Sequence, residues 1–152
     1  MSNVLSDISN LGSWAYNCLP SIIRTEVKEV ERLVEVEMFA KGKHFVRIAG
    51  ASGAFAVAMA AYGSHVFKNS EADQAMKEGF SNANHMHLIH SAALLAVPLT
   101  KRPVLVGTAM SLGIVLFSGT IYIHALTGST KFRSLTPYGG MLLIFSWLAM
   151  IV

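Results

Sequence analysis

The sequence predicts an all-α integral membrane protein, in which four transmembrane helices form an up-and-down bundle (residues 45–152) behind an amphipathic helical extension (residues 1–44). Two observations lead to this fold class. Charged residues make up only 14% of the 152 residues and hydrophobic residues 53%, whereas an average soluble domain carries about 25% charged residues. In addition, residues 79–152 contain no acidic residue and only four basic ones, in two pairs separated by long uncharged runs, as in chains that cross a bilayer repeatedly.

Three stretches have the length and character of spanning helices, which need about 20 mainly apolar residues. The clearest is 103–126, which is uncharged and would reach roughly 36 Å as a helix. A second, at about 47–67, follows Arg47, whose long side chain can reach the headgroups. A third, 135–152, contains Pro137 at the place where a helix tolerates proline, in its first turn.

The fourth predicted span, 80–99, is less obvious because its first half is polar. Without it, the apolar run 88–99 would be left beside two clear spans with no partner. A half-polar helix is stable in a membrane if its polar side faces the bundle. We therefore predict four spans with short connections.

The extension of residues 1–44 contains two amphipathic segments, both too short or too polar to span. In residues 4–19 the apolar positions recur at spacings of three and four. In residues 25–38, Val27, Val30, Val34 and Met38 form a second stripe beside five glutamates. Anionic lipid would repel so acidic a segment, which favours a protein partner, although a solvated helix fits equally well.

Several classes of function are disfavoured. The single cysteine, Cys18, excludes an intramolecular disulfide. A net charge of +3 is too small for a nucleic-acid binder. The chain has no Ser/His/Asp set with an acid in a span, no phosphate-binding glycine loop and no HExxH motif. No catalytic residue, metal or cofactor is therefore predicted, and no cleavable secretory signal is evident.

Small residues at helical spacing predict which faces meet. One row in the first span comprises Gly50, Ala54, Ala58, Ala61 and His65, on a different face from a bulky stripe of Phe55, Met59, Tyr62 and Val66. Another row in the third span comprises Gly107, Ser111, Ser118 and Tyr122. Small residues allow helix backbones to approach closely in lipid, so we expect both rows to contribute to the seam of the bundle.

The six histidines are the most informative polar residues. Threading the chain through four spans places five of them at one depth: His65, His85, His87, His90 and His124. Among these, His65, His87 and His90, together with Tyr122, are the candidates for binding a cofactor or ligand. Three interpretations are open: a metal or haem site, a proton relay, and a hydrogen-bonded polar layer that ties helix ends together. The third is favoured because no carboxylate lies within the spans.

Four ordered motifs resemble those of a known family. They are Gly63-Ser64-His65, residues 84–95 (NHMHLIHSAALL), residues 117–122 (FSGTIY) and residues 135–140 (LTPYGG). Together they resemble the small membrane family called transmembrane protein 256 in animals, which has bacterial relatives described as a domain of unknown function. The resemblance covers residues 45–152 and implies four membrane helices; the animal members imply a mitochondrial inner-membrane location. Ser64 and Val66 depart from the family's usual Gly-Ala-His-Gly.

These observations predict a non-enzymatic accessory subunit of a mitochondrial inner-membrane complex, plausibly a respiratory complex. It would contact lipid, and it would bind its partners through residues 1–44 and the surface of the bundle. The alternatives are a small protein that binds a cofactor or ligand through the histidine layer, and a small transporter.

Overall fold

The computed structural model describes residues 21–151, and within them every regular element is a helix. The predicted all-α class is therefore confirmed. Its contacts divide the chain into two units, Met1–Glu37 and Met38–Val152. The predicted amphipathic segment 4–19 lies outside the described residues. In the first unit, the described residues form the beginning of a helix on which Val30, Leu33 and Val36 are 58–63% exposed; the side chains of Val27, Val34 and Met38 are not among those described.

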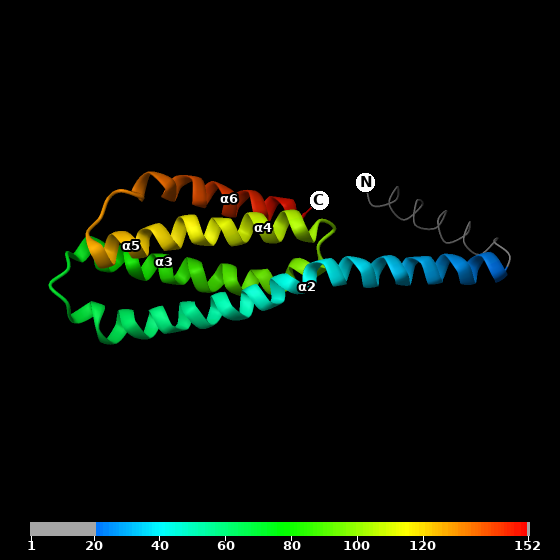
Figure 1. The fold of residues 1–152 in the computed structure, drawn as a ribbon, viewed down its shortest axis with the longest axis horizontal. Coiled ribbons are helices and arrows are strands. Elements are labelled where there is room, and N and C mark those ends of the chain that lie inside the picture. Colours follow the sequence, from blue (N-terminus) through cyan, green and yellow to red (C-terminus); the bar gives the residue numbers. More distant parts are fainter. Residues whose placement is uncertain (1–20, 152) are drawn as a thin grey trace, which may run out of the picture. The chain divides into compact units, whose positions relative to one another are not determined.

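The elements follow one another in the order α2 (Ser21–His65), η1 (Phe67–Asn69), α3 (Gln74–Ala93), η2 (Leu94–Leu99), α4 (Pro103–Ile114), η3 (Val115–Gly119), α5 (Thr120–Thr127), η4 (Arg133–Leu135) and α6 (Thr136–Ala149). Figure 1 shows the second unit as four helical rods lying side by side in alternating directions. The rods are α2, α3 with η2, α4 to α5, and α6.

The helix boundaries follow the local sequence. Pro103 begins α4 and Pro137 lies in the first turn of α6, where a missing N–H costs nothing. Gly128 ends α5 at φ +70°, a left-handed conformation that glycine adopts without steric cost. The third rod was predicted as one regular helix; instead, its middle turn Val115–Gly119 is a π-helix. Such bulges insert a residue into an α-helix and often mark functional sites.

The predicted spans agree only partly with these helices. Among the described residues, two stretches are long and apolar enough to cross a membrane, Gly42–Asn69 and Pro103–Thr127. They contain the predicted spans 47–67 and 103–126 completely. The predicted span 80–99 corresponds to a helix that begins earlier, with a polar first half, and continues as a 3-10 helix from Leu94. The predicted span 135–152 is regular only over the 14 residues of α6. Four spans therefore remain a prediction.

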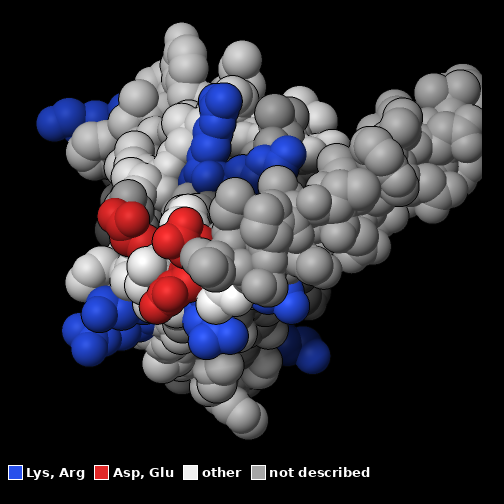
Figure 2. Space-filling model, turned by 90° about the vertical axis from the view of Figure 1, so that its right-hand side faces the viewer, with Lys and Arg blue, Asp and Glu red and all other residues white. Residues whose placement is uncertain are grey.

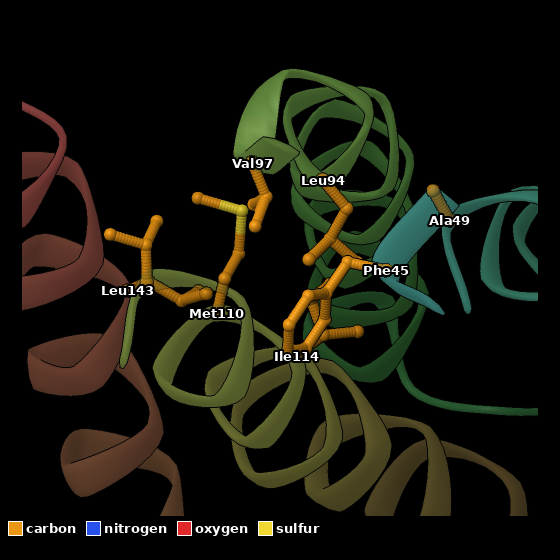
Figure 3. Close-up of a cluster of buried hydrophobic side chains, with 8 residues drawn as sticks. Phe45, Ala49, Leu94, Val97, Met110, Ile114 and Leu143 are labelled. Carbon is orange, nitrogen blue, oxygen red and sulfur yellow. The ribbon is translucent and has the colours of Figure 1, made fainter. Parts of the chain in front are cut away.

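A compact apolar core joins all four rods at the end where η2 leads into α4. Its buried side chains, seven of which are labelled in Figure 3, are Phe45, Ala49, Leu94, Val97, Val106, Met110, Ile114 and Leu143. Phe45 from α2 lies directly against Gly107, where an added Cβ would come within 2.5 Å of the ring. The predicted small row of α4 and α5 therefore does face the bundle: Gly107, Ser118 and Tyr122 are buried and Ser111 is half-buried.

The predicted small row of α2 was wrong. Its five members, Gly50 to His65, are all exposed. The buried face of α2 instead includes Phe45, Ala49 and Ala56. The physical reason is that alanine and glycine occur around most of this helix, so that more than one row has small residues at spacings of three and four. Which row is buried depends on which side of α2 faces the polar residues of α3 and offers them hydrogen-bond partners.

Charges of both signs are exposed on the face of the molecule shown in Figure 2. This face therefore lacks the uniformly basic surface that is typical of nucleic-acid binding.

Candidate functional site

Five polar side chains meet between α2, α3 and α5 in the middle of the second unit, and we call this group the polar seam. It comprises Ser52, Asn84, His87, Ser91 and Tyr122. Four of these residues are buried and Ser52 is half-buried. Buried polar groups destabilise a fold unless they are hydrogen-bonded, so the partners of each atom determine what the seam can do.

Asn84 links three helices. Its Nδ2 donates one hydrogen bond to the carbonyl oxygen of Ala56 on α2, at 2.8 Å, and another to the hydroxyl of Tyr122 on α5, at 3.1 Å. Both N–H groups of the amide are therefore used, and the side chain is only 8% exposed.

The positions of the protons around His87 follow from counting the hydrogen-bond donors that its neighbours have available. The Ser91 hydroxyl donates its one proton to the carbonyl of His87, at 2.8 Å. The bond between Ser52 Oγ and Ser91 Oγ, 2.7 Å long, must therefore use the proton of Ser52. Ser52 Oγ can then only accept from His87 Nε2, 3.0 Å away. His87 thus carries a proton on Nε2.

The other ring nitrogen completes the seam. His87 Nδ1 lies 3.4 Å from the hydroxyl of Tyr122, which already accepts from Asn84. A neutral ring has a lone pair on Nδ1, so the Tyr122 hydroxyl donates to it. With a neutral His87, the protons of all three hydroxyl groups and both ring nitrogens have a partner. We call such a seam closed, because each of these groups is hydrogen-bonded to another group of the chain.

His90 makes a separate contact on another side of α3. Its Nδ1 lies 2.6 Å from the carbonyl of Met86, and its Nε2 accepts from the indole N–H of Trp147 on α6, at 3.1 Å. The proton of His90 is therefore on Nδ1, the opposite tautomer to that of His87. Although the two histidines are three residues apart, they bind different helices.

The remaining histidines do not join these contacts. His44, His65 and His85 are exposed, and His124 Nδ1 pairs with the carbonyl of Ser129, 3.2 Å away. In the part of the chain that the structure describes, no three His, Cys, Asp or Glu side chains lie close enough to hold a metal ion. The structure therefore does not join the five histidines into one site, and their common depth in a membrane stays a prediction. The physical reason is that similar depth along a bundle does not place side chains on facing sides of their helices.

An apolar groove of about 450 Å3 lies beside the seam, between α2 and the third rod. Its wall includes Phe55, Ile114 and Val115, and His87 and Tyr122 lie at its polar side. The π-helix Val115–Gly119, called the π-turn below, contributes Val115, Ser118 and Gly119 to this wall. The groove has room for an apolar group, but the hydroxyl and imidazole protons that border it are already used within the seam.

Of the four candidate residues, the structure brings His87 and Tyr122 together and pairs His90 with α6, whereas His65 is exposed and joins neither contact. Sequence reasoning missed the partners Ser52, Ser91 and Trp147. One signal was available: Ser52 is the only polar residue in the otherwise apolar stretch 48–61. A sequence alone does not show that the indole N–H of Trp147 reaches a histidine on another helix.

Helices with exposed apolar faces around a buried polar seam are typical of helical membrane proteins. The comparisons agree. A family model described as a protein of unknown function (DUF423) matches residues 59–140. A UPF0382 membrane protein of Staphylococcus saprophyticus is 30% identical over 115 residues, which cover 72% of this chain and 95% of the relative. The chain therefore belongs to the DUF423 family and is an integral membrane protein.

Two further relatives have the same description. A UPF0382 membrane protein of Schizosaccharomyces pombe is 32% identical over 113 residues, 69% of this chain and 96% of the relative. The protein YwdK of Bacillus subtilis, also a UPF0382 membrane protein, is 27% identical over 117 residues, 72% of this chain and 94% of the relative. No solved structure matches. The predicted membership of a membrane family of unknown function is thus confirmed, while the narrower likeness to the animal members stays a resemblance.

Proposed function

We propose that this protein is a four-span, non-enzymatic accessory subunit of a larger membrane assembly. The observation that carries the proposal is the closed polar seam. Each proton of His87, Ser52, Ser91 and Tyr122 is used within the chain. A catalytic group needs a proton or lone pair that is free for a substrate, whereas a fully satisfied network gives rigidity and a unique packing.

Four spans are supported by what the two less apolar rods expose. On α3 and η2 the exposed side chains beyond the polar half include Leu88, Ile89 and Leu95, and on α6 they include Met141 and Ile144. The 20 residues of α3 alone measure about 30 Å, which is the thickness of the hydrocarbon core. Exposed apolar side chains around both rods suit contact with lipid or with another membrane helix.

A protein partner is supported by the first part of α2. Val30, Leu33 and Val36 are exposed there among charged side chains, including Lys28 and Arg32. The charges disfavour burial in lipid, and the apolar side chains gain free energy when a partner removes them from water. The segment is therefore suited to docking on a protein surface next to the membrane.

The finer parts of the proposal are a mitochondrial inner-membrane address and a respiratory complex as the assembly. They rest on the resemblance to the animal family. The relatives from Staphylococcus and Bacillus come from organisms without mitochondria, so a role common to the family would have to be one that a bacterial membrane also offers.

A small-ligand-binding protein is the second candidate, because the apolar groove beside His87 and Tyr122 has a volume of about 450 Å3. A haem absorbance band or one equivalent of bound metal in the purified protein would favour this function. A transporter would be indicated if the rate of solute transport across the membrane changed when His87 and His90 are replaced by alanine.

The accessory role predicts co-migration. After gentle detergent extraction, the protein should migrate on native gels with partners that mass spectrometry identifies. Deleting residues 1–40 removes the docking segment but keeps the Gly42–Asn69 stretch, so the variant should stay in the membrane yet leave the assembly.

A matched pair of variants controls for lost charge. Lys28→Glu with Arg32→Glu changes the docking segment, whereas Lys101→Glu with Arg102→Glu changes an equally exposed basic pair outside it. The first pair should reduce co-migration several-fold and the second should leave it unchanged. Migration of the native protein as a small species, or unchanged co-migration after deletion of residues 1–40, would contradict the proposal.

A further inference from the structure

A small hollow lies at the end of the second unit where α2 turns into α3. Its volume is about 290 Å3, and we call it the lysine pocket. Its lining includes Phe67, Lys68, Lys77, Phe80, Ser81 and His85. The pocket is separate from the apolar groove, with which it shares no lining residue.

The floor of the pocket is aromatic and tightly packed. The rings of Phe67 and Phe80 are both buried, and their centroids are 4.9 Å apart. Gly63 permits this packing, because a Cβ at that position would come within 2.6 Å of the Phe80 ring. The floor is therefore a fixed apolar surface rather than a gap between mobile side chains.

The walls of the pocket are polar and cationic. Lys77 is half-buried, and its ammonium donates to the carbonyl of Ser70 at 2.7 Å. This bond positions the group and leaves two of its three N–H donors for a ligand. Lys68 is exposed and makes no hydrogen bond or ion pair with any other residue that the structure describes. Ser81 and His85 add two more side chains that can donate hydrogen bonds.

No acidic side chain is among the described residues that line the pocket. The three nearest carboxylates in the sequence lie outside this lining: Glu71 is exposed, Glu78 accepts from the amide of Gln74 at 3.0 Å, and Asp73 lines a different hollow, next to α5 and α6. The pocket thus presents two ammonium groups that no carboxylate within it neutralises. Such a site is complementary to an anion with several acceptor oxygens.

The depth of the pocket matches the lipid headgroups. It extends from the turn down to Ala60, five residues before α2 ends at His65, which is about 8 Å along a helix. The headgroup layer on each side of a bilayer is about 5–8 Å thick. An anion in this pocket would lie at the level of the phosphates, with the aromatic floor next to the first carbons of the acyl chains.

We propose that the lysine pocket binds the phosphate group of an anionic membrane lipid, with Lys68 and Lys77 as its cationic ligands. The same chemistry would recognise free phosphate. The apolar floor and the headgroup depth favour the lipid. The inference rests on the chain lying in a bilayer, which its family membership supports, and not on the accessory role, so each can fail without the other.

The test uses the full-length protein in a neutral detergent and native mass spectrometry to measure binding of one short-chain phosphatidylglycerol. Lys68→Gln should weaken the apparent Kd about tenfold, because it removes a charge-assisted contact without breaking any bond within the protein. Lys131→Gln is the matched control: it removes one exposed lysine from the same end of the unit but outside the pocket, and it should change the Kd less than twofold. Adding Lys77→Gln to Lys68→Gln should weaken binding further.

Two ligand controls identify the source of the phosphate. Diacylglycerol with the same chains should bind at least tenfold more weakly than phosphatidylglycerol, and millimolar inorganic phosphate should not displace the lipid. Equal weakening by Lys68→Gln and Lys131→Gln would mean general attraction of charges and would overturn the site. Displacement by inorganic phosphate, or equal binding of diacylglycerol, would overturn the assignment to a lipid phosphate.

Discussion

Replacing Gly139 with alanine is expected to lower the free energy of unfolding by about 2–3 kcal/mol. A Cβ at this position would collide with the backbone nitrogen of Phe117 and come within 2.7 Å of the carbonyl carbon of Leu116. Both atoms belong to the main chain of the π-helix Val115–Gly119. Main-chain atoms cannot rotate away from the added methyl group as a side chain can. The substitution therefore forces α6 and the third rod apart, and the bond between Thr120 and Thr136, 2.7 Å long, lies at the same contact.

Gly140 provides the matched control for this prediction. A Cβ there would meet only the Phe117 ring, at 3.6 Å, which is ordinary van der Waals contact. Gly140→Ala should consequently change stability by less than about 0.5 kcal/mol. The measurement is unfolding in mixed micelles by added sodium dodecyl sulfate, followed by circular dichroism. Equal effects of the two substitutions would show that α6 does not pack on the π-turn.

Replacing His87 with leucine is expected to lower the free energy of unfolding by about 2 kcal/mol. Leucine fills a similar volume, so the main loss is that of hydrogen bonds. The hydroxyl groups of Ser52 and Tyr122 would both lose the imidazole as a partner. Because both lie between helices, unpaired polar groups there are costly, and α2 would lose one of its ties to α3.

His85 provides the matched control on the same helix. It is exposed and outside the seam, so His85→Leu should change stability by less than about 0.5 kcal/mol. His87→Gln should recover part of the loss, because its amide offers both a donor and an acceptor. A His87→Leu protein as stable as the native one would show that the seam does not hold the bundle together.

Much of the fold could be predicted from the sequence, because uncharged apolar runs and proline positions determine where helices lie and begin without reference to the rest of the chain. The stretches Gly42–Asn69 and Pro103–Thr127 and the start of α6 at Thr136 are of this kind. The π-turn could not be predicted, since residues 115–119 have an ordinary apolar composition. Its geometry depends on packing against Gly139, on a helix that follows later in the chain.

The candidate site was predicted less well, and the histidines show why. Sequence spacing places His87 and His90 on neighbouring sides of one helix, but it does not show which helix packs against each side. In the structure, His87 forms hydrogen bonds with Ser52 and Tyr122, and His90 forms one with Trp147. The same ambiguity explains the error on α2: small residues occur on several of its sides, and the side that is buried is the one that packs in the apolar core through Phe45 and accepts from Asn84 at Ala56.

The measurement that tests the central claim of four spans most directly is the side of the membrane on which each turn lies. Single cysteines are placed at Glu71, Lys101, Thr130 and Ile151, all exposed, in a Cys18→Ser background, and are labelled in oriented vesicles by an impermeant maleimide. Four spans predict that positions 71 and 130 react from one side and positions 101 and 151 from the other. With only the Gly42–Asn69 and Pro103–Thr127 spans, positions 71 and 101 would react from the same side and position 130 from the other. That result would contradict the four-helix account.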